Sequence, residues 1–543
     1  MATISIVLIL LLAVVASGFL ARMIPYAIPL PLLQVALGAV IAFATNTRVE
    51  LDPEIFFVLF LPPLLFLDGW RIPKIGLFRD ISTILELSLG LVIFTVVGMG
   101  FLIHWMIPAM PLAVAFALAA VISPTDPVAV SAIASKTPIP KRLMHILEGE
   151  SLLNDASGLV CLRFAVAAAV TGTFSLADAS LTFLYLAIGG ISVGVILTII
   201  VTRVKMWVAR HFGEESGTQI LISLLIPFGA YIIAEHLHCS GILAAVAAGI
   251  TMSYAEATGQ ALAATRVRRN VVWDTVQFAA NGIIFVILGE QLPGIAEEAA
   301  HIVKETGHHE AWWLGVYVVA IVTGLLAMRF VWVWVSFRIT MFRKKQQPPA
   351  YMMRIVAASS VAGIKGAITL AGILTLPLVL NDGTPLPARD LAIFLAAGVI
   401  ILSIMIASFA LPRLLNGLEI SPDAIHEAEE DFARVSAAHA AIKAIELAQH
   451  DMAEGRPDAD LYVDVSARVM ELYRHRLDTH MEEDERAREE FRKINEIEQA
   501  MRLIALKAER DEIFRLGRSR KIEDDVMRKL VREIDILEGQ YSS

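Results

Sequence analysis

Long apolar runs recur along the chain up to about residue 415, and they constrain the fold more than any other feature. A run of about 20 apolar residues is long enough for one helix to cross the hydrocarbon core of a bilayer. Repeated runs of that length indicate helices, because the strands of a membrane barrel are short and alternate apolar with polar residues. The chain is 56% hydrophobic, which is above the usual share for a soluble domain. The sequence therefore predicts an all-α polytopic membrane protein.

Hydropathy predicts about thirteen transmembrane helices. We interpret the first apolar run as a membrane helix and not as a signal peptide, because it lacks a positively charged start. The spans cover approximately 4–21, 24–45, 54–70, 81–106, 111–134, 145–171, 179–202, 218–237, 240–254, 271–290, 311–337, 353–380 and 389–413.

Lys and Arg are distributed unevenly between the loops that join these spans. Loops after odd-numbered spans carry 18 of these residues, whereas loops after even-numbered spans carry only Arg48, Lys304 and Arg389. Because positively charged loops stay in the cytoplasm, we expect the N-terminus outside and the C-terminal region inside. The expected location is the inner membrane of a bacterium.

The composition changes at about Gly417. From there to Ser543 the chain carries 20 Lys/Arg and 31 Asp/Glu, in polar segments that favour helices. We therefore expect two domains: a membrane domain over 1–416, and a soluble, acidic, cytoplasmic helical tail over 417–543. The excess of acid argues against nucleic acid as a partner. Two interpretations of the tail stay open: helices that pack together or pair between subunits, and a regulatory segment whose partner is unknown.

Two of the predicted spans contain residues that interrupt helices. Span 5 includes Pro124 and Pro127, and span 12 includes Gly363 and Gly366. The two spans are seven apart, and an odd separation gives them opposite orientations. Inverted repeats with two broken helices are typical of secondary transporters, whose binding site lies near the middle of the membrane.

Carboxylates lie at the expected depth of the membrane in spans 5 and 6, and an ionisable residue at this depth indicates a functional site. Asp126 follows Thr125 at the interruption of span 5, where carbonyl groups lack helical partners. In span 6, Ser151 and Asp155 are four residues apart and share a helix face. These oxygen atoms suit Na⁺, Li⁺ or K⁺. A buried carboxylate such as Asp155 can hold either a proton or a cation, which would couple two ion fluxes.

Further polar residues at this depth are expected to support the site. Glu150 and Asn154 share another face of span 6, and Asn154 is counted with Asp155, Asp126, Thr125 and Ser151 among the candidates that bind the cation and the proton. Arg329 and Lys365 each require a partner inside the membrane. Glu150 is the candidate partner of Arg329, and Asp126 or a carbonyl group of the broken helix is the candidate partner of Lys365.

Several stretches of the chain resemble the monovalent cation:proton antiporter-1 family, the sodium/proton exchangers of the NhaP and NHE type. The resemblance rests on five stretches: 56–66 (FFVLFLPPLLF), 123–130 (SPTDPVAV), 148–155 (EGESLLND), 273–289 around Trp273, Asn281 and Gly289, and 363–367 (GIKGA). It implies a homodimer of thirteen-helix protomers, each with a dimerisation domain and a mobile core domain that provides elevator-like alternating access.

The resemblance also assigns roles to residues. Asp155 matches the essential ion- and proton-binding aspartate, and Asn154 before it marks the electroneutral branch. Thr125, Asp126 and Ser151 match positions of the cation site, and Glu150 and Arg329 match a buried ion pair.

Two positions depart from the family pattern. Lys365 stands where arginine is usual, and Leu67 stands where the family often has an acid. Asp68 follows one residue later, about 100° around a helix, and is not assumed to replace that acid.

These observations predict an antiporter that exchanges Na⁺, or Li⁺ or K⁺, for H⁺ and contributes to pH homeostasis. We expect no enzymatic activity and no cofactor, and we expect membrane lipids and a second protomer as partners. Two alternatives stay open: a passive cation channel, and a membrane scaffold or sensor that signals through its tail.

Overall fold

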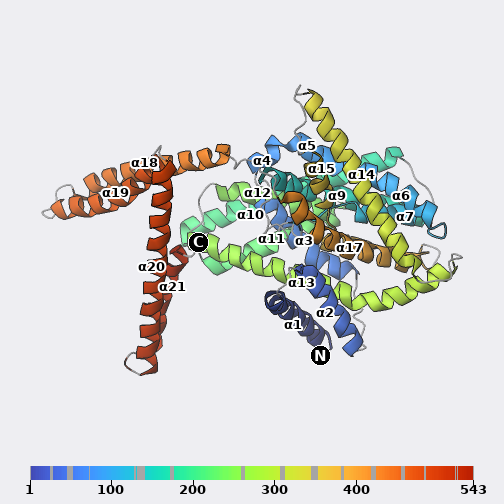
Figure 1. Cartoon of the computed structure of the whole chain (residues 1–543), viewed down its shortest axis with the longest axis horizontal. Helices are drawn as coiled ribbons and strands as arrows, with labels where there is room; N and C mark the ends of the chain where they lie inside the picture. Colours follow the sequence, from blue (N-terminus) through green and yellow to red (C-terminus); the bar gives the residue numbers. More distant parts are fainter. Residues whose placement is uncertain are drawn as a thin grey trace. The chain divides into compact units, whose positions relative to one another are not determined.

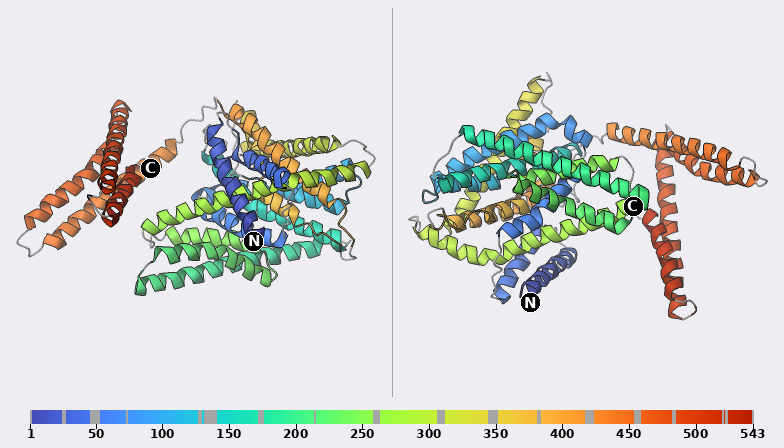
Figure 2. Two further views of the ribbon diagram at one scale, coloured as in Figure 1. Left: turned by 90° about the horizontal axis from the view of Figure 1, so that it is seen from below. Right: turned by 180° about the vertical axis from the view of Figure 1, so that it is seen from behind.

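The computed structural model describes residues 2–24, 28–45, 53–72, 74–126, 130, 141–171, 176–213, 215–257, 263–305, 312–343, 352–380, 384–416, 424–453, 459–481, 485–519, 521 and 524–541. Contacts between residues divide the chain into two units, 1–418 and 419–543 (Figures 1 and 2). Every regular element in the described ranges is a helix, and the β-type pairing seen there is an isolated bridge between Val379 and Pro385. The all-α prediction is confirmed.

The first unit is a bundle of apolar helices. Its elements are α1 (Ala2–Met23), α2 (Leu30–Thr45), α3 (Pro53–Arg71), α4 (Lys74–Arg79), α5 (Ile81–Leu85), the π-helical turn η1 (Glu86–Leu91), α6 (Val92–Met106), α7 (Leu112–Ile122), α9 (Lys141–Thr171), α10 (Leu176–Phe212), α11 (Ser216–His236), α12 (Gly241–Ala257), α13 (Ala263–Glu305), α14 (Trp313–Arg343), α15 (Met352–Val361), α16 (Ala367–Leu374) and α17 (Arg389–Leu415).

Helices occur at the positions of all the predicted spans. Eight described helical stretches are long and apolar enough to cross a membrane, and four further apolar helices are shorter. Helix α10 leaves large apolar side chains exposed, including Leu184, Ile188 and Ile196. A soluble protein rarely exposes an apolar surface this extensive, whereas lipid covers it without cost. The first unit is therefore a multi-pass membrane unit.

Two of the predicted spans leave helical geometry inside the bundle. Helix α7 ends at Ile122, after which Ser123–Asp126 continue as non-helical chain, while Pro127 lies outside the described residues. Helix α15 ends at Val361, and α16 begins only at Ala367. The two non-helical segments meet, because the Asp126 amide donates a 2.8 Å hydrogen bond to the Ile364 carbonyl oxygen. This contact places the two interruptions side by side.

Helices α2 and α13 approach so closely that glycine is required on both. A Cβ added at Gly38 would overlap the Val286 carbonyl oxygen, and one added at Gly289 would overlap the Val35 carbonyl oxygen. Small residues let backbones approach in this way where lipid supplies no hydrophobic drive for helix association. The long helix α13 is thereby fixed against α2.

A separate apolar cluster joins α3 to α10, α11, α12 and α13. Phe66 stacks on Trp273 with ring centroids 5.4 Å apart, and Trp70 lies beside both rings. Leu67 is fully buried in the same cluster. These contacts fix the rotation of α3 about its axis, which decides where Asp68 points.

The second unit consists of two helical hairpins. Helices α18 (Ala424–Ala453) and α19 (Ala459–Met481) pack together, as do α20 (Glu485–Arg518) and α21 (Asp524–Tyr541). Leu506, Ile513 and Ile534 form a small core between α20 and α21. Arg510 of α20 pairs with Asp535 at 3.0 Å, and it also contacts Glu538.

Candidate functional site

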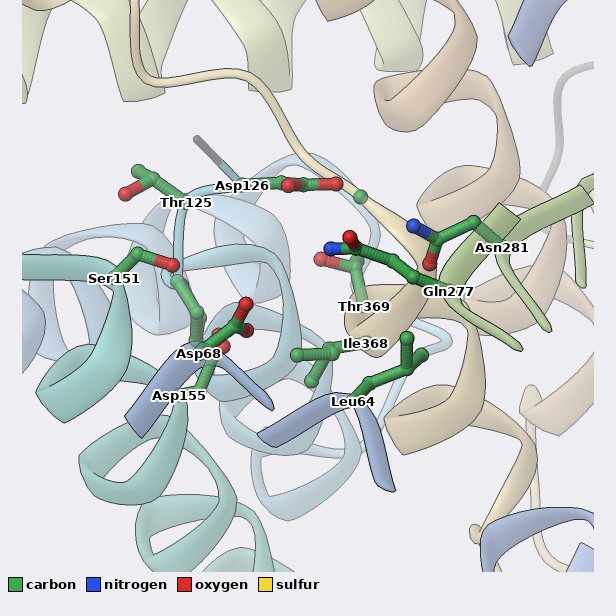
Figure 3. Close-up of a pocket in the computed structure, with 12 residues that line it drawn as sticks. Leu64, Asp68, Thr125, Asp126, Ser151, Asp155, Gln277, Asn281, Ile368 and Thr369 are labelled. Carbon is green, nitrogen blue, oxygen red and sulfur yellow. The ribbon is translucent and has the colours of Figure 1, made fainter. Parts of the chain in front are cut away.

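A small polar cavity lies within the membrane unit, next to the two helix interruptions (Figure 3). Its volume is about 30 Å³, which is enough for about two water molecules or one largely dehydrated monovalent cation. Residues from α3, α9, α13, α16 and the segment after α7 line it: Leu64, Asp68, Pro124, Thr125, Asp126, Ser151, Asp155, Gln277, Asn281, Gly366, Ile368 and Thr369.

Helix α9 supplies Ser151 and Asp155 to this cavity. Both side chains are 3% exposed, and both line the cavity because residues four apart lie above one another on a helix (Figure 3). A hydroxyl group and a carboxylate on successive turns present adjacent oxygen atoms. Four candidates from the sequence, namely Asp155, Ser151, Asp126 and Thr125, therefore meet at one cavity.

The neighbouring face of α9 carries Glu150 and Asn154, which do not line the cavity. Arg329 of α14 donates to both carboxylate oxygens of Glu150, at 2.5 and 2.7 Å, and to the Ser359 carbonyl oxygen at 3.0 Å. Glu150 is 1% exposed. This bidentate geometry is the strong form of a charged hydrogen bond, so the pair ties α9 to α14 and α15.

Asn154 belongs to this network and does not line the cavity. Its Nδ2 donates to the Thr125 hydroxyl oxygen at 3.0 Å, while Glu150 Oε1 lies 3.4 Å away. Thr125 itself lines the cavity. Asn154, a predicted ion-binding residue, is thus one contact removed from the cavity and can position Thr125.

Lys365 holds the end of α7. Its Nζ donates to the carbonyl oxygens of Ser123 and Pro124, at 2.8 and 2.9 Å. These carbonyl groups have lost their helical partners because the helix has ended, and a cation is favoured at a helix C-terminus. Of the two partners that the sequence left open for Lys365, the structure pairs it with the carbonyl groups.

Asp126 lies against the start of α16. A Cβ added at Gly366, the residue before α16, would overlap the Asp126 carboxylate. The first amide groups of a helix have no helical acceptor and favour a negative charge. Each non-helical segment thus supplies a charge that stabilises the helix end of the other. Lys365 lies at the C-terminal end of α7, and Asp126 lies at the N-terminal end of α16.

Asp68 also faces the cavity. Leu64 and Asp68 are four residues apart on α3 and line the cavity together, whereas Leu67 is buried in the aromatic cluster (Figure 3). An acid from α3 is therefore present at the site, one residue later than the family pattern suggests.

Three neutral polar residues line the cavity and are not among the predicted site residues: Gln277 and Asn281 of α13, and Thr369 of α16. Gln277 and Asn281 are four apart in a largely apolar helix, a spacing that could have indicated one polar face. The Gln277 side-chain oxygen accepts a 2.9 Å hydrogen bond from Arg71, which also pairs with Asp274. Arg71 therefore orients an amide at the cavity.

A membrane-embedded helical bundle in which the non-helical segments after α7 and α15 meet beside buried carboxylates is typical of a secondary ion transporter. The sequence model described as "Sodium/hydrogen exchanger, transmembrane" matches residues 7–417. The chain belongs to this sodium/hydrogen exchanger family, and the resemblance seen in its motifs is confirmed.

Individual relatives agree with this assignment. The chain is 42% identical over 541 residues to the protein described as "Uncharacterized Na(+)/H(+) exchanger YjcE" of Escherichia coli K12, and the match covers 98% of each chain. It is 43% identical over 417 residues to the sodium, potassium, lithium and rubidium/H(+) antiporter of Bacillus subtilis 168, covering 75% of this chain and 61% of that protein. The solved structure of the antiporter MjNhaP1 from Methanocaldococcus jannaschii at pH 8 shares the fold, with a TM-score of 0.59 at 19% identity over 78% of this chain and all of that one.

Proposed function

We propose that this protein is a secondary antiporter that exchanges a monovalent cation for H⁺ by alternating access. One observation carries the proposal: one small cavity in the membrane unit brings Asp155 and Asp126 together with hydroxyl groups beside the two helix interruptions. A carboxylate inside a membrane protein is costly unless a proton or a cation compensates its charge. Competition between the two for one carboxylate couples their movements without a covalent step.

Each residue then has a role in the exchange. Asp155 is the group that alternates between proton and cation. Asp126, Thr125, Ser151 and Asp68 supply further oxygen atoms around the ion. Lys365 and the pair of Glu150 with Arg329 hold the broken helices in place, and Asn154 positions Thr125.

The preferred cation is Na⁺, and Li⁺ and K⁺ are further substrates. Carboxylate, hydroxyl and carbonyl oxygen atoms are hard ligands that suit these ions. The Bacillus subtilis relative is named for sodium, potassium, lithium and rubidium, which supports a site that accepts more than one of them. Since one carboxylate carries either one proton or one monovalent cation, the exchange is electroneutral.

The protein is a homodimer in a bacterial inner membrane. Each protomer has thirteen spans with inverted repeats, an outer N-terminus and a cytoplasmic, soluble tail over 417–543. The helices at the predicted span positions and the opposing interruptions after α7 and α15 support this arrangement. Through this exchange, a change in the cellular Na⁺ concentration changes the cellular pH, and a change in pH changes the Na⁺ concentration. The exchange therefore contributes to pH homeostasis.

Proton flux in proteoliposomes tests the exchange. An outward Na⁺ gradient imposed across vesicles containing the full chain should drive protons inward against their own gradient, and clamping the membrane potential at zero should leave the rate unchanged. The same assay with Li⁺ and K⁺ ranks the cations. A channel would pass ions without driving protons uphill, and a scaffold would move neither, so each of these results would refute the antiporter.

Replacement of Gly366 by Ala should impair exchange strongly. The added methyl group overlaps the Asp126 carboxylate, so either that side chain or the non-helical segment must move. In enzymes, a displacement of about 1 Å in a positioned group can cost roughly 10²-fold in rate, and we expect a loss of that order. The measurement is Na⁺-dependent proton flux.

Gly372→Ala, in the helix α16 that follows Gly366, is the matched control. A Cβ there would approach side-chain atoms of Leu159 and Val121 at 3.3 Å, which flexible groups can accommodate. Full exchange in Gly366→Ala would show that Asp126 need not hold its present position.

A further inference from the structure

Helix α20 of the second unit has two apolar faces, and only one of them is covered. Leu506 and Ile513 face α21 in the small core of the hairpin. On another face, four large apolar side chains are between 47% and 68% exposed: Ile494, Ile497, Met501 and Ile504. The first three also line a shallow groove. An exposed apolar stripe of this length on a polar helix marks an interaction surface.

The spacing of this stripe is that of a coiled coil. The four residues are separated by three, four and three positions, which places them at alternating a and d sites of a heptad repeat. An a/d stripe is narrower than the face that a helix presents to a globular core. The pattern therefore favours one partner helix that runs alongside α20.

We propose that this face of α20 pairs, parallel and in register, with α20 of a second copy of the chain. The proposal concerns the second unit alone and does not depend on ion exchange by the first.

The charges beside the stripe favour this partner and this orientation. With Ile494 at position a, Lys493 occupies g and Glu498 occupies e, five residues later. In a parallel pair each g residue lies beside the e residue five positions on in the partner. Two symmetric contacts between lysine and glutamate then form, and the next such pair, Ala500 with Ala505, adds no charge.

An antiparallel pair would instead match flanking positions of the same kind, lysine with lysine and glutamate with glutamate. Within its own helix, Glu498 accepts two bonds from Arg502, both at Oε1. Its second oxygen can therefore accept a bond from a partner lysine. The acidic balance of residues 417–543, with 31 Asp/Glu against 20 Lys/Arg, makes an anionic lipid surface a poor alternative partner.

Disulfide cross-linking of the full chain in membranes tests the pairing. In a parallel, in-register pair each a or d residue faces its own copy, so Met501→Cys and Ile504→Cys should each form a covalent dimer on mild oxidation. Glu509→Cys, exposed and outside the a, d, e and g positions, is the control and should cross-link about tenfold more slowly. The chain with only its native Cys161 and Cys239, both in the membrane unit, supplies the background.

Charge-reversal variants distinguish specific pairing of the two α20 helices from cross-linking that needs only proximity of two tails. In the Met501→Cys chain, Lys493→Glu or Glu498→Lys alone places like charges together and should slow cross-linking several-fold, and the two changes combined should restore it. Equal cross-linking at positions 501, 504 and 509 would overturn the proposal, as would indifference to the charge reversals. Because the readout is a covalent dimer, neither result bears on the proposed exchange.

Discussion

Asp155→Asn should abolish cation-driven proton movement in proteoliposomes while the protein still folds. The Asp155 side chain is 3% exposed and lines the cavity with Ser151, so its carboxylate is the group best placed to carry a proton or a cation. Asparagine has nearly the same shape but neither releases a proton nor carries a negative charge. We therefore expect complete loss of exchange, measured as Na⁺-, Li⁺- and K⁺-dependent proton flux.

The control for this change is Asp390→Asn. Asp390 lies in the first turn of α17, 39% exposed and paired with Arg389, and it does not line the cavity. It should keep full exchange. A monodisperse Asp155→Asn protein with wild-type unfolding temperature and measurable exchange would contradict the assignment of Asp155.

Arg329→Gln should destabilise the membrane unit severely. The change leaves the Glu150 carboxylate, which is 1% exposed, without the guanidinium group that neutralises it. Removal of one partner from a buried ion pair costs about 3–5 kcal/mol, because the remaining charge is buried without compensation. A clear fall in unfolding temperature in detergent, together with lower yield of folded protein, is the expected result.

The double variant Glu150→Gln with Arg329→Gln shows whether the loss of stability in Arg329→Gln comes from the uncompensated charge of Glu150 or from the lost shape of the guanidinium group. Two neutral amides carry no uncompensated charge, and replacing a whole buried ion pair is often close to neutral. The double variant should therefore be more stable than Arg329→Gln alone. If the double variant is as unstable as the single one, the guanidinium group acts mainly through packing and through its bond to the Ser359 carbonyl oxygen.

Charged residues made much of the site predictable from the sequence. A charge inside a membrane needs a partner, and that requirement, together with the family resemblance, predicted the pair of Glu150 and Arg329, which are in contact. Helical periodicity separated Ser151 and Asp155 from Glu150 and Asn154 correctly. The interruption near Gly363 was visible because glycine weakens a helix, and the chain is non-helical there.

Other features depend on contacts between segments far apart in the sequence, which local sequence patterns do not show. The choice between Leu67 and Asp68 depends on the rotation of α3, which the stacking of Phe66 on Trp273 determines through residues more than 200 positions apart. Lys365 had two acceptable partners, and the selection of the α7 carbonyl groups required the crossing of the two broken segments. Gln277 and Thr369 are neutral, so their burial costs too little to mark them as functional.

The cavity lining comes from helices that are anchored in different places. Asp68 and Gln277 stand on α3 and α13, which pack on α12 and α2, whereas Asp155 stands on α9, which packs on α7 and η1. In the exchange proposed above, a cation bound in this cavity would contact both groups of helices at once, and its release would remove that contact.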